Sequence, residues 1–340
     1  MDTLELKFQK LFKATKEMTE NEKTQLNNRE VVYQNNITSV VLMGFPNLKN
    51  IKVLLFMILF LIYCMTICGN LLVMTLSLLS KSLQSPMYFF ISQLSLLDVM
   101  LSTVILPNLL YIVLYGGCTM SLTECILQFS FFTTTETCEC LLLAVMSYDR
   151  YLAIYNPLRY SSIINQRFCI KSVLIIWLLA FKITLINPLS MSTLHYCGPN
   201  VIDHFYCDFE PILKLSCSDT SWIHVETFIM AFLFVAIPFL IIVISYIYIA
   251  VTVLKIPSVT GRQKAFSTCS YHLSVVFIFY GTIIFVYLFP KNGQMHIMSK
   301  LLSLFYTVIT PFLNPIIYTF RNKEFKKAFE KITSNSVKFW

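Results

Sequence analysis

Long runs of apolar residues alternate with short polar segments over most of the chain. Each run continues for about 20 residues or more, the length that a helix needs to cross the hydrocarbon core of a bilayer. We identify seven runs, over residues 51–79, 86–113, 123–155, 169–190, 223–254, 264–289 and 298–320. Backbone groups in lipid have no water to bond, so such segments must be helices. The pattern therefore predicts an all-α membrane protein built as a seven-transmembrane helix bundle.

A shorter amphipathic stretch follows the last apolar run. Its apolar positions recur at helical spacing, and its lysines lie off that stripe. The apolar positions are Phe325, Ala328, Phe329 and Ile332, and the lysines are Lys326, Lys327 and Lys331. This pattern predicts a short helix lying on the inner leaflet of the membrane. We therefore divide the chain into an N-terminal tail (1–48), a transmembrane domain (49–320) and a C-terminal helix and tail (321–340).

The composition supports the membrane assignment. Of the 340 residues, 56% are hydrophobic and 13% are charged, against about 25% charged in an ordinary soluble domain. So few charges exclude a soluble globular domain, and so much apolar surface excludes a disordered chain. The net charge of +8 suits a basic cytoplasmic face against anionic membrane lipids and requires no nucleic acid.

Lysine and arginine are distributed unevenly between the two sides of the predicted bundle. The side whose short loops are richer in these residues faces the cytoplasm. One side carries Lys81, Arg159, Arg167, Lys171, Lys255, Arg262, Lys264 and the six basic residues from Arg321 to Lys338. The opposite loops carry only Lys214 and Lys291, with Lys300 at a span end. We therefore expect a cytoplasmic C-terminus and an extracellular N-terminus, although the N-terminal tail is itself rich in lysine.

Two further features favour an extracellular N-terminus. Asn36-Ile37-Thr38 is a glycosylation sequon, which is used only on the outer side. Five cysteines also lie in the outer segments, where disulfides persist. They are Cys118, Cys125, Cys197, Cys207 and Cys217.

Ionisable residues inside apolar spans are costly and suggest function. Asp98 and Glu139 are predicted near the middle of the membrane, with Asn70 and Asn314 at similar depth. Two carboxylates cannot both stay charged there without compensation. They therefore bind a cation such as sodium or share a proton, and a hydrogen-bonded packing network is the alternative. Apart from this ion we expect no cofactor.

Two other polar positions allow both a functional and a structural interpretation. Asp149-Arg150-Tyr151 ends the third span, where the acid can hold the arginine and release it to a partner, or the arginine can simply reach the lipid headgroups. Glu136 lies further out on the same span. It faces either a basic or hydrogen-bonding ligand or a neighbouring helix.

Enzymatic and metal chemistry lack a sequence signal. His204 and Cys207 form a single H-x-x-C pair without further ligands, and the five histidines are scattered. The spacing of a zinc protease and a phosphate-binding glycine loop are both missing. We therefore expect neither an enzyme nor a metal protein.

Several motifs follow one another in a fixed order. They are Gly69-Asn70, SPMYFFISQLSLLDV (85–99), Cys125-x-x-Gln128, ECLLLAVMSYDRYLAIYNPLRY (139–160), KAFSTCSYHLSVVFIFYGT (264–282) and PFLNPIIYTFRNKEF (311–325). Together they resemble the olfactory receptors, a family of rhodopsin-like (class A) G-protein-coupled receptors. The resemblance runs from about Asn36 to Lys327. Tyr155 departs from the cysteine usual in the family, and Ser270-Tyr271 departs from Ala-Ser.

The resemblance implies two disulfides and an activation relay. It pairs Cys125 with Cys207 and Cys197 with Cys217, a choice that four cysteines alone leave open among three pairings. It assigns the relay at the G-protein face to residues near the inner ends of spans three, five and seven. These are Asp149, Arg150, Tyr151, Tyr246, Asn314, Pro315 and Tyr318.

The resemblance also implies ligand, partner and location. An odorant would bind in the outer half of the bundle, where helical spacing proposes inward-facing positions. They are Phe132, Thr133, Glu136, Thr137, Met230, Phe234, Tyr280, Ile283, Tyr287, Leu304 and Thr307. This mostly apolar set suits a small hydrophobic molecule with one polar group, and an amine if Glu136 is ionised.

As a member of that family, the chain would reside in the plasma membrane and activate a stimulatory, olfactory-type heterotrimeric G protein that raises cyclic AMP. Two alternatives stay open. One is a rhodopsin-like receptor for a non-odorant small molecule, and the other is a transporter or channel.

Overall fold

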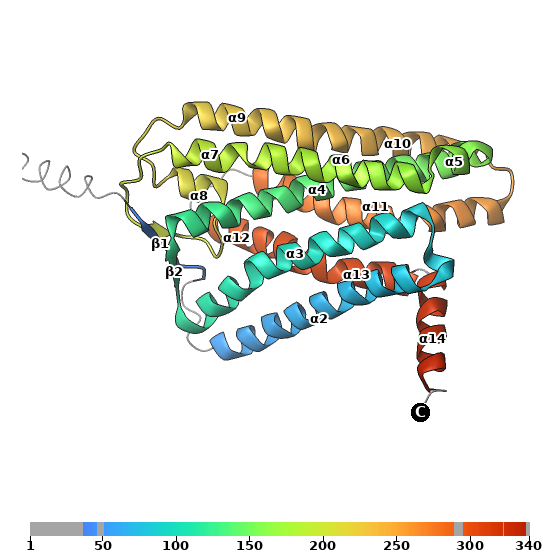
Figure 1. Ribbon diagram of the computed structural model, residues 1–340, viewed down its shortest axis with the longest axis horizontal. Helices are drawn as coiled ribbons and strands as arrows, with labels where there is room; N and C mark the ends of the chain where they lie inside the picture. Colours follow the sequence, from blue (N-terminus) through green and yellow to red (C-terminus); the bar gives the residue numbers. More distant parts are fainter. Residues whose placement is uncertain (1–36, 46–50, 289–294, 322, 338–340) are drawn as a thin grey trace, which may run out of the picture.

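The computed structural model describes residues 37–45, 51–288, 295–321 and 323–337, which form a bundle of long helices (Figure 1). The first three spans are α2 (Lys52–Leu79), α3 (Pro86–Tyr115) and α4 (Leu122–Tyr155). The fourth is α6 (Gln166–Thr184) continued by α7 (Ile186–Ser192), and the fifth is α9 (Ser221–Ala231), η2 (Phe232–Ala236) and α10 (Ile237–Leu254). The sixth is α11 (Val259–Leu288), and the seventh is α12 (Met295–Leu304), η3 (Phe305–Ile309) and α13 (Thr310–Arg321).

The predicted seven-helix bundle is confirmed, with one difference in extent. Six helices in the described part of the chain are long and apolar enough to cross a membrane, and they match six of the predicted runs to within three residues. In α11 only His272–Ile284 forms an apolar stretch, and the helix begins at Val259, five residues before the predicted start at 264. The prediction was based on hydropathy, which detects only the apolar part of a helix. The first turns of α11, including Gly261 to Gln263, are mostly polar and were therefore not included.

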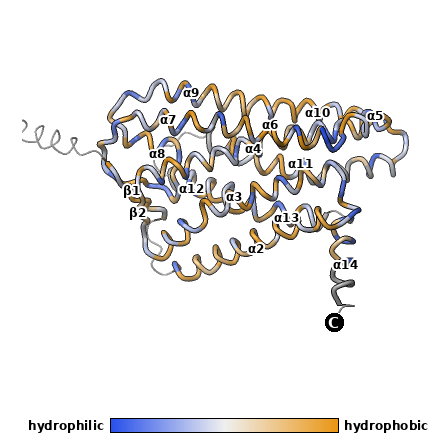
Figure 2. The backbone as a smooth tube through the Cα atoms, viewed as in Figure 1, coloured by the Kyte–Doolittle hydropathy of each residue, from blue (hydrophilic) through white to orange (hydrophobic). Residues whose placement is uncertain are grey.

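Apolar side chains cover the outside of the bundle as well as its interior. Figure 2 shows hydrophobic residues along the outer helices, with more hydrophilic positions towards the ends. In α10, Leu240, Ile244 and Ile247 are exposed, which is expected of a surface in contact with lipid. The core lies around α4, which packs against α3, α6 and α10. Phe132 of α4 is almost completely buried.

A small sheet closes one end of the bundle, which we call the sheet end. Its strands are β1 (Ser39–Leu42), β2 (Cys118–Ser121) and β3 (Val201–Ile202), in the order β2-β1-β3. The strand β1 is antiparallel to β2 and parallel to β3, and its Val40 and Leu42 are fully buried. The last part of the segment predicted as a tail is therefore a central strand.

Local sequence explains how the chain enters and leaves this sheet. Gly116 ends α3 with a φ of +87°, a left-handed conformation that glycine adopts without a steric penalty. Ser121 then starts α4 with a capping box, in which its hydroxyl accepts from the Glu124 amide at 3.1 Å and its own amide donates to the Glu124 carboxylate at 2.8 Å.

The helix α14 (Lys323–Val337) leaves the opposite end of the bundle at a steep angle (Figure 1). We call this end the α14 end. Phe325 and Ala328 are buried against the bundle, with the ring of Phe325 edge-on to Tyr88 at a centroid distance of 5.3 Å. Phe329 is 45% exposed, and the side chain of Ile332 lies outside the described residues. Part of the predicted apolar stripe therefore packs against the bundle, at Phe325 and Ala328, and part of it is exposed, at Phe329.

Candidate functional site

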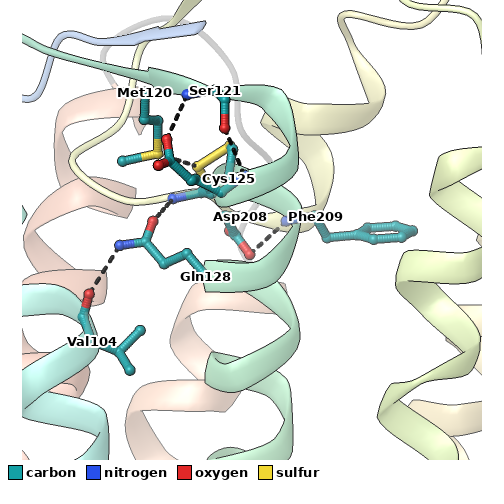
Figure 3. Close-up of a disulfide and its surroundings, with 9 residues drawn as sticks. Val104, Met120, Ser121, Cys125, Gln128, Asp208 and Phe209 are labelled. Carbon is teal, nitrogen blue, oxygen red and sulfur yellow. Dashed lines mark hydrogen bonds between the residues drawn. A yellow bond between two sulfur atoms is a disulfide. The ribbon is translucent and has the colours of Figure 1, made fainter. Parts of the chain in front are cut away.

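A disulfide fixes the long loop between α7 and α9 over the bundle. Cys125 of α4 is joined to Cys207 in this loop, with a Cα–Cα distance of 5.4 Å. Figure 3 shows Gln128 one turn below, where its amide donates to the Val104 carbonyl at 3.0 Å and accepts from the Cys207 amide at 3.0 Å. Gln128 therefore binds α3, α4 and the loop together, which gives the Cys125-x-x-Gln128 spacing a structural reason.

The same loop carries the second disulfide that the resemblance implies. Cys197 and Cys217 are joined with a Cα–Cα distance of 5.9 Å. Backbone hydrogen bonds support it, from Cys197 to the Leu215 carbonyl at 3.1 Å and from Cys217 to the His195 carbonyl at 2.9 Å. Cys118 keeps a free thiol in β2. Burial, and secondly the charge of Glu124, raise the pKa of that thiol.

Phe132 marks the centre of the predicted ligand site. Its ring lies 5.1 Å from that of Tyr206 in the loop and 5.8 Å, edge-on, from that of Tyr306 in the π-helical turn η3. Tyr306 also lies edge-on to Phe279 of α11, with 6.1 Å between ring centroids. The seventh span, the sixth span and the loop thus meet around one aromatic side chain of the third span.

Tyr306 and Phe279 were missed by the sequence analysis. The positions proposed for the seventh span, Leu304 and Thr307, assume a regular α-helix. The π-helical turn Phe305–Ile309 adds a residue to one turn, so the inward face shifts and Tyr306 is buried. Thr307 is also fully buried, but its hydroxyl donates to the Ser303 carbonyl of its own helix at 2.7 Å.

Glu136 lies one turn from Phe132 and is half-buried. The hydroxyl of Tyr306 is close enough to its carboxyl group to interact with it, and the carboxylate of Asp208 is close enough to interact with it electrostatically. The acid therefore has a partner on a neighbouring helix, in line with the structural alternative. It also lies among aromatic residues where a ligand group would meet it.

The remaining proposed ligand positions differ in their surroundings. Thr133 is half-buried, with its hydroxyl donating to the Phe129 and Ser130 carbonyls of its own helix. Thr137, Met230, Phe234 and Leu304 are half-buried as well, and Tyr280 and Ile283 are buried. The Tyr280 ring lies 4.8 Å from that of Phe239. The side chain of Tyr287 lies outside the described residues.

The polar residues predicted near mid-membrane are brought together in part. The Asn314 amide donates to both carboxylate oxygens of Asp98, each at 3.0 Å, and the Glu139 carboxyl group is near enough to interact with Asp98 electrostatically. Within the described residues, one oxygen of Glu139 has no hydrogen-bond partner. Asn70 is bonded elsewhere, to the carbonyls of Thr66 at 3.0 Å and Pro311 at 3.1 Å.

At the α14 end, Arg150 is held by its neighbouring acid. Its guanidinium group donates to Asp149, with Nε at 2.8 Å from Oδ2, and the Tyr160 hydroxyl donates to the other carboxylate oxygen at 2.7 Å. All of this lies inside the protein, because Asp149 and Arg150 are buried. Tyr160, on α5 (Pro157–Ile163), was not predicted as a site residue although it ends the span-three motif.

Four further residues of the predicted relay, Tyr151, Tyr246, Pro315 and Tyr318, lie towards this end, whereas Asn314 is bonded to Asp98 near mid-membrane. The Tyr246 hydroxyl and His272 Nδ1 are 2.6 Å apart, which joins α10 to α11. The ring of Tyr151 stacks on that of Tyr155 at 5.1 Å. Tyr318 is buried in α13, where Pro315 lies inside the helix.

Three further charged or polar positions have different surroundings. Asn36, the predicted glycosylation site, lies outside the described residues. Lys182 is exposed on the outside of the bundle. Lys300 is buried, with its ammonium group donating to the Gly44 carbonyl at 2.8 Å and forming an ion pair with Asp203. The sequence analysis used Lys300 only as a charge at a span end. In the structure it connects the seventh span to the N-terminal segment and to the loop.

Comparison with known proteins extends over the whole bundle. A sequence model described as "Olfactory receptor" matches residues 59–336. Olfactory receptor 10A7 of Homo sapiens is 42% identical over 301 residues, covering 88% of this chain and 95% of the relative. Olfactory receptor 6B1 of Homo sapiens is 41% identical over 303 residues, covering 89% and 97%. Olfactory receptor 5AP2 of Mus musculus is 43% identical over 304 residues, covering 88% and 95%.

Proposed function

The chain belongs to the olfactory receptor family, and from that premise we propose that it binds a small, mostly hydrophobic odorant in the half of the bundle next to the sheet. Members of this family are multi-pass membrane receptors and not enzymes. Binding would activate a heterotrimeric G protein of the stimulatory, olfactory type and so raise cyclic AMP.

The observation that carries this proposal is the aromatic meeting point at Phe132. Rings from the loop and from the sixth and seventh spans converge there, and the disulfide of Cys125 holds the loop over it. A ligand in contact with these rings touches the loop and three different spans at once. It can therefore favour one arrangement of the helices by binding it more tightly than the other.

Arg150 is the group through which such a change would reach the G protein. In the described structure its charge is neutralised by Asp149, and Tyr160 supports that acid. Release of Arg150 would free a buried cation at the α14 end, where a helix of the G protein could enter a groove between the spans. The same end carries the basic loops, so we propose that it faces the cytoplasm and that the sheet end faces outwards at the plasma membrane.

The Asp98 and Glu139 carboxyl groups require compensation in this setting. Asn314 supplies two hydrogen bonds to Asp98, and oxygen-rich groups of this kind suit a hard cation. We propose that one sodium ion or one shared proton neutralises the pair. Replacement of sodium by choline in the assay buffer changes the ligand concentration for half-maximal response if the ion is sodium, and leaves it unchanged if the proton is shared.

The function is tested by measuring cyclic AMP in cells that express the chain together with an olfactory G-protein α subunit. The panel would contain alcohols, acids, esters, aldehydes, ketones and amines. We expect at least one class to raise cyclic AMP, and Arg150→Ala to abolish the response at matched surface expression. A response that persists in Arg150→Ala, or no response from any class with the chain at the surface, would contradict the proposal.

A further inference from the structure

The fifth span carries an acid on its inward face that the ligand site described above does not use. Along α9, Trp222, Val225 and Phe228 are exposed, whereas Glu226 and its neighbour Thr227 are half-buried. Glu226 lies one turn before Met230, which was proposed as a ligand contact. The carboxylate therefore lies on the side of α9 that faces the protein and not on the side that faces lipid.

The facing side of α7 is polar as well. Asn187 and Ser190 are one turn apart and buried, while Leu185 and Leu189 are exposed. The Ser190 hydroxyl donates to Glu226 Oε2 at 3.0 Å. This bond joins the outer part of the fourth span to that of the fifth.

Three buried polar atoms on the described parts of α7 and α9 have no hydrogen-bond partner. They are Glu226 Oε1, Asn187 Oδ1 and Thr227 Oγ1, and Asn187 is only 7% exposed. Native proteins pair nearly all such atoms, so these three, which are two acceptors and one hydroxyl, need a specific explanation. A group with several N–H donors and a positive charge would satisfy the carboxylate and the amide oxygen together.

We propose that Glu226, Asn187, Ser190 and Thr227 form a binding subsite for the primary ammonium group of an amine ligand. The subsite rests on the proposed function and names the class of ligand. An ammonium group has three donors, and charge-assisted hydrogen bonds to a carboxylate are strong away from water. The alkyl chain of the amine would then extend along the apolar residues Met230 and Phe234 of the same face.

Glu136 is the acid of the predicted ligand site, and its surroundings differ. The Tyr306 hydroxyl is close enough to its carboxyl group to interact with it, so an amine would have to compete with that hydroxyl. Glu226 keeps its bond to Ser190, and its second oxygen has no partner in the part of the chain that the structure describes. The structure therefore assigns the amine to Glu226 rather than to Glu136.

The test is a binding measurement that needs no G protein, so it is independent of the signalling proposal. Full-length chain in lipid nanodiscs is heated with increasing hexylamine, N,N,N-trimethylhexylammonium or hexan-1-ol, and the unfolding midpoint is recorded. A ligand that binds the folded state raises the midpoint in a saturable way. We expect hexylamine to do so, and the trimethylated form, which has the charge but no N–H donor, to leave it unchanged.

Variants then locate the ammonium group. Glu226→Gln keeps the shape of the side chain and its bond to Ser190, and should lower the affinity for hexylamine about tenfold or more. Asn187→Leu should lower that affinity less. Glu210→Gln removes an acid of the short helix α8 (Phe209–Leu213), where the Glu210 side chain is 42% exposed, and should have no effect. The proposal is overturned if wild-type chain shows no saturable shift with hexylamine, if the trimethylated form shifts it equally, or if Glu136→Gln and not Glu226→Gln removes the shift.

Discussion

The side-chain amide of Asn70 donates to the main-chain carbonyl of Pro311 at 3.1 Å. In a regular helix that carbonyl would accept from the residue four positions later, which is Pro315 and has no N–H. Asn70 of the first span thus supplies the donor that the seventh span lacks. The neighbouring Gly69 makes the approach possible, because a Cβ at this position would lie 3.1 Å from Cγ of Pro315.

We predict that Asn70 and Pro315 are energetically coupled. Asn70→Leu leaves the buried Pro311 carbonyl without its donor and should lower the free energy of unfolding by about 1–3 kcal/mol. In a Pro315→Ala background the new N–H can bond that carbonyl, so Asn70→Leu should cost less there. The double-mutant cycle, measured from thermal unfolding in nanodiscs, is expected to give a coupling of about 1 kcal/mol. Thr75→Ala, on the exposed face of α2, is the control, and equal costs in both backgrounds would refute the coupling.

Substitution of alanine at two helical glycines should have different effects on the stability of the chain. A Cβ at Gly69 would lie 3.1 and 3.3 Å from the Pro315 ring, whereas a Cβ at Gly281 would have no atom of the described residues within 4 Å. Gly281→Ala should therefore stabilise the chain by about 0.5–1 kcal/mol through helix propensity. Gly69→Ala should show no gain, or a loss, because α2 and α13 must separate slightly. Equal stabilisation by both substitutions, measured as unfolding midpoints, would show that the close contact with Pro315 is unimportant.

The spans were predictable from hydropathy because each one is apolar over about the 20 residues that a membrane helix needs, whether its side chains face outwards or into the bundle. The disulfide pairing was available only through family resemblance, since spacing leaves three pairings open. The strand Ser39–Leu42 was not predicted, because a run of four residues is too short to be recognised alone and its partners lie about 80 and 160 residues away along the chain.

Side-chain roles were harder to predict than helices. Tyr306 was missed because a π-helical turn changes which residues face inwards. Glu226 was missed because the fifth span is so apolar that a single acid near its end resembles a loop residue. Lys300 carried no signal beyond its charge, since its partners Gly44 and Asp203 come from segments whose positions only the fold determines.

Tyr160 should restrain Arg150 in the absence of ligand. Tyr160→Phe removes the hydroxyl that donates to Asp149 at 2.7 Å, which leaves the acid less firmly positioned against Arg150. We expect basal cyclic AMP to rise about two- to fivefold at equal surface expression, corresponding to a loss of about 0.5–1 kcal/mol from one hydrogen bond. Tyr155→Phe, at an exposed tyrosine near the same end, serves as the control. Unchanged basal cyclic AMP in Tyr160→Phe would argue against this restraint.

The two partners in the Lys300–Asp203 ion pair should contribute unequally. Lys300 is buried, whereas the side chain of Asp203 is 68% exposed. Lys300→Met removes the donor of the buried Gly44 carbonyl and should lower the free energy of unfolding by about 1–3 kcal/mol. Asp203→Asn should cost less than about 1 kcal/mol, because the exposed carboxylate is solvated in either case. A larger loss in Asp203→Asn than in Lys300→Met would mean that the charge pair, and not the Gly44 bond, holds the seventh span to the sheet.

The thiol of Cys118 should react slowly near neutral pH. Burial and the nearby charge of Glu124 raise its pKa, and the thiolate is the reactive form. Alkylation by iodoacetamide should therefore speed up with pH until well above the range of an ordinary cysteine, as followed by mass spectrometry. Glu124→Gln can keep the capping hydrogen bonds of Ser121 but removes the charge, so the rate profile should move to lower pH. A profile that Glu124→Gln leaves in place would limit the cause to burial.

Nucleotide exchange with purified components tests the central claim most directly. The full-length chain in nanodiscs is combined with an olfactory-type heterotrimeric G protein and the class of odorant found active in cells, and GTPγS uptake by the α subunit is followed. We predict that odorant accelerates exchange in wild-type chain and has no effect in Arg150→Ala. Odorant binding without faster exchange, or an odorant-gated ion current through the chain with no G protein present, would contradict the account.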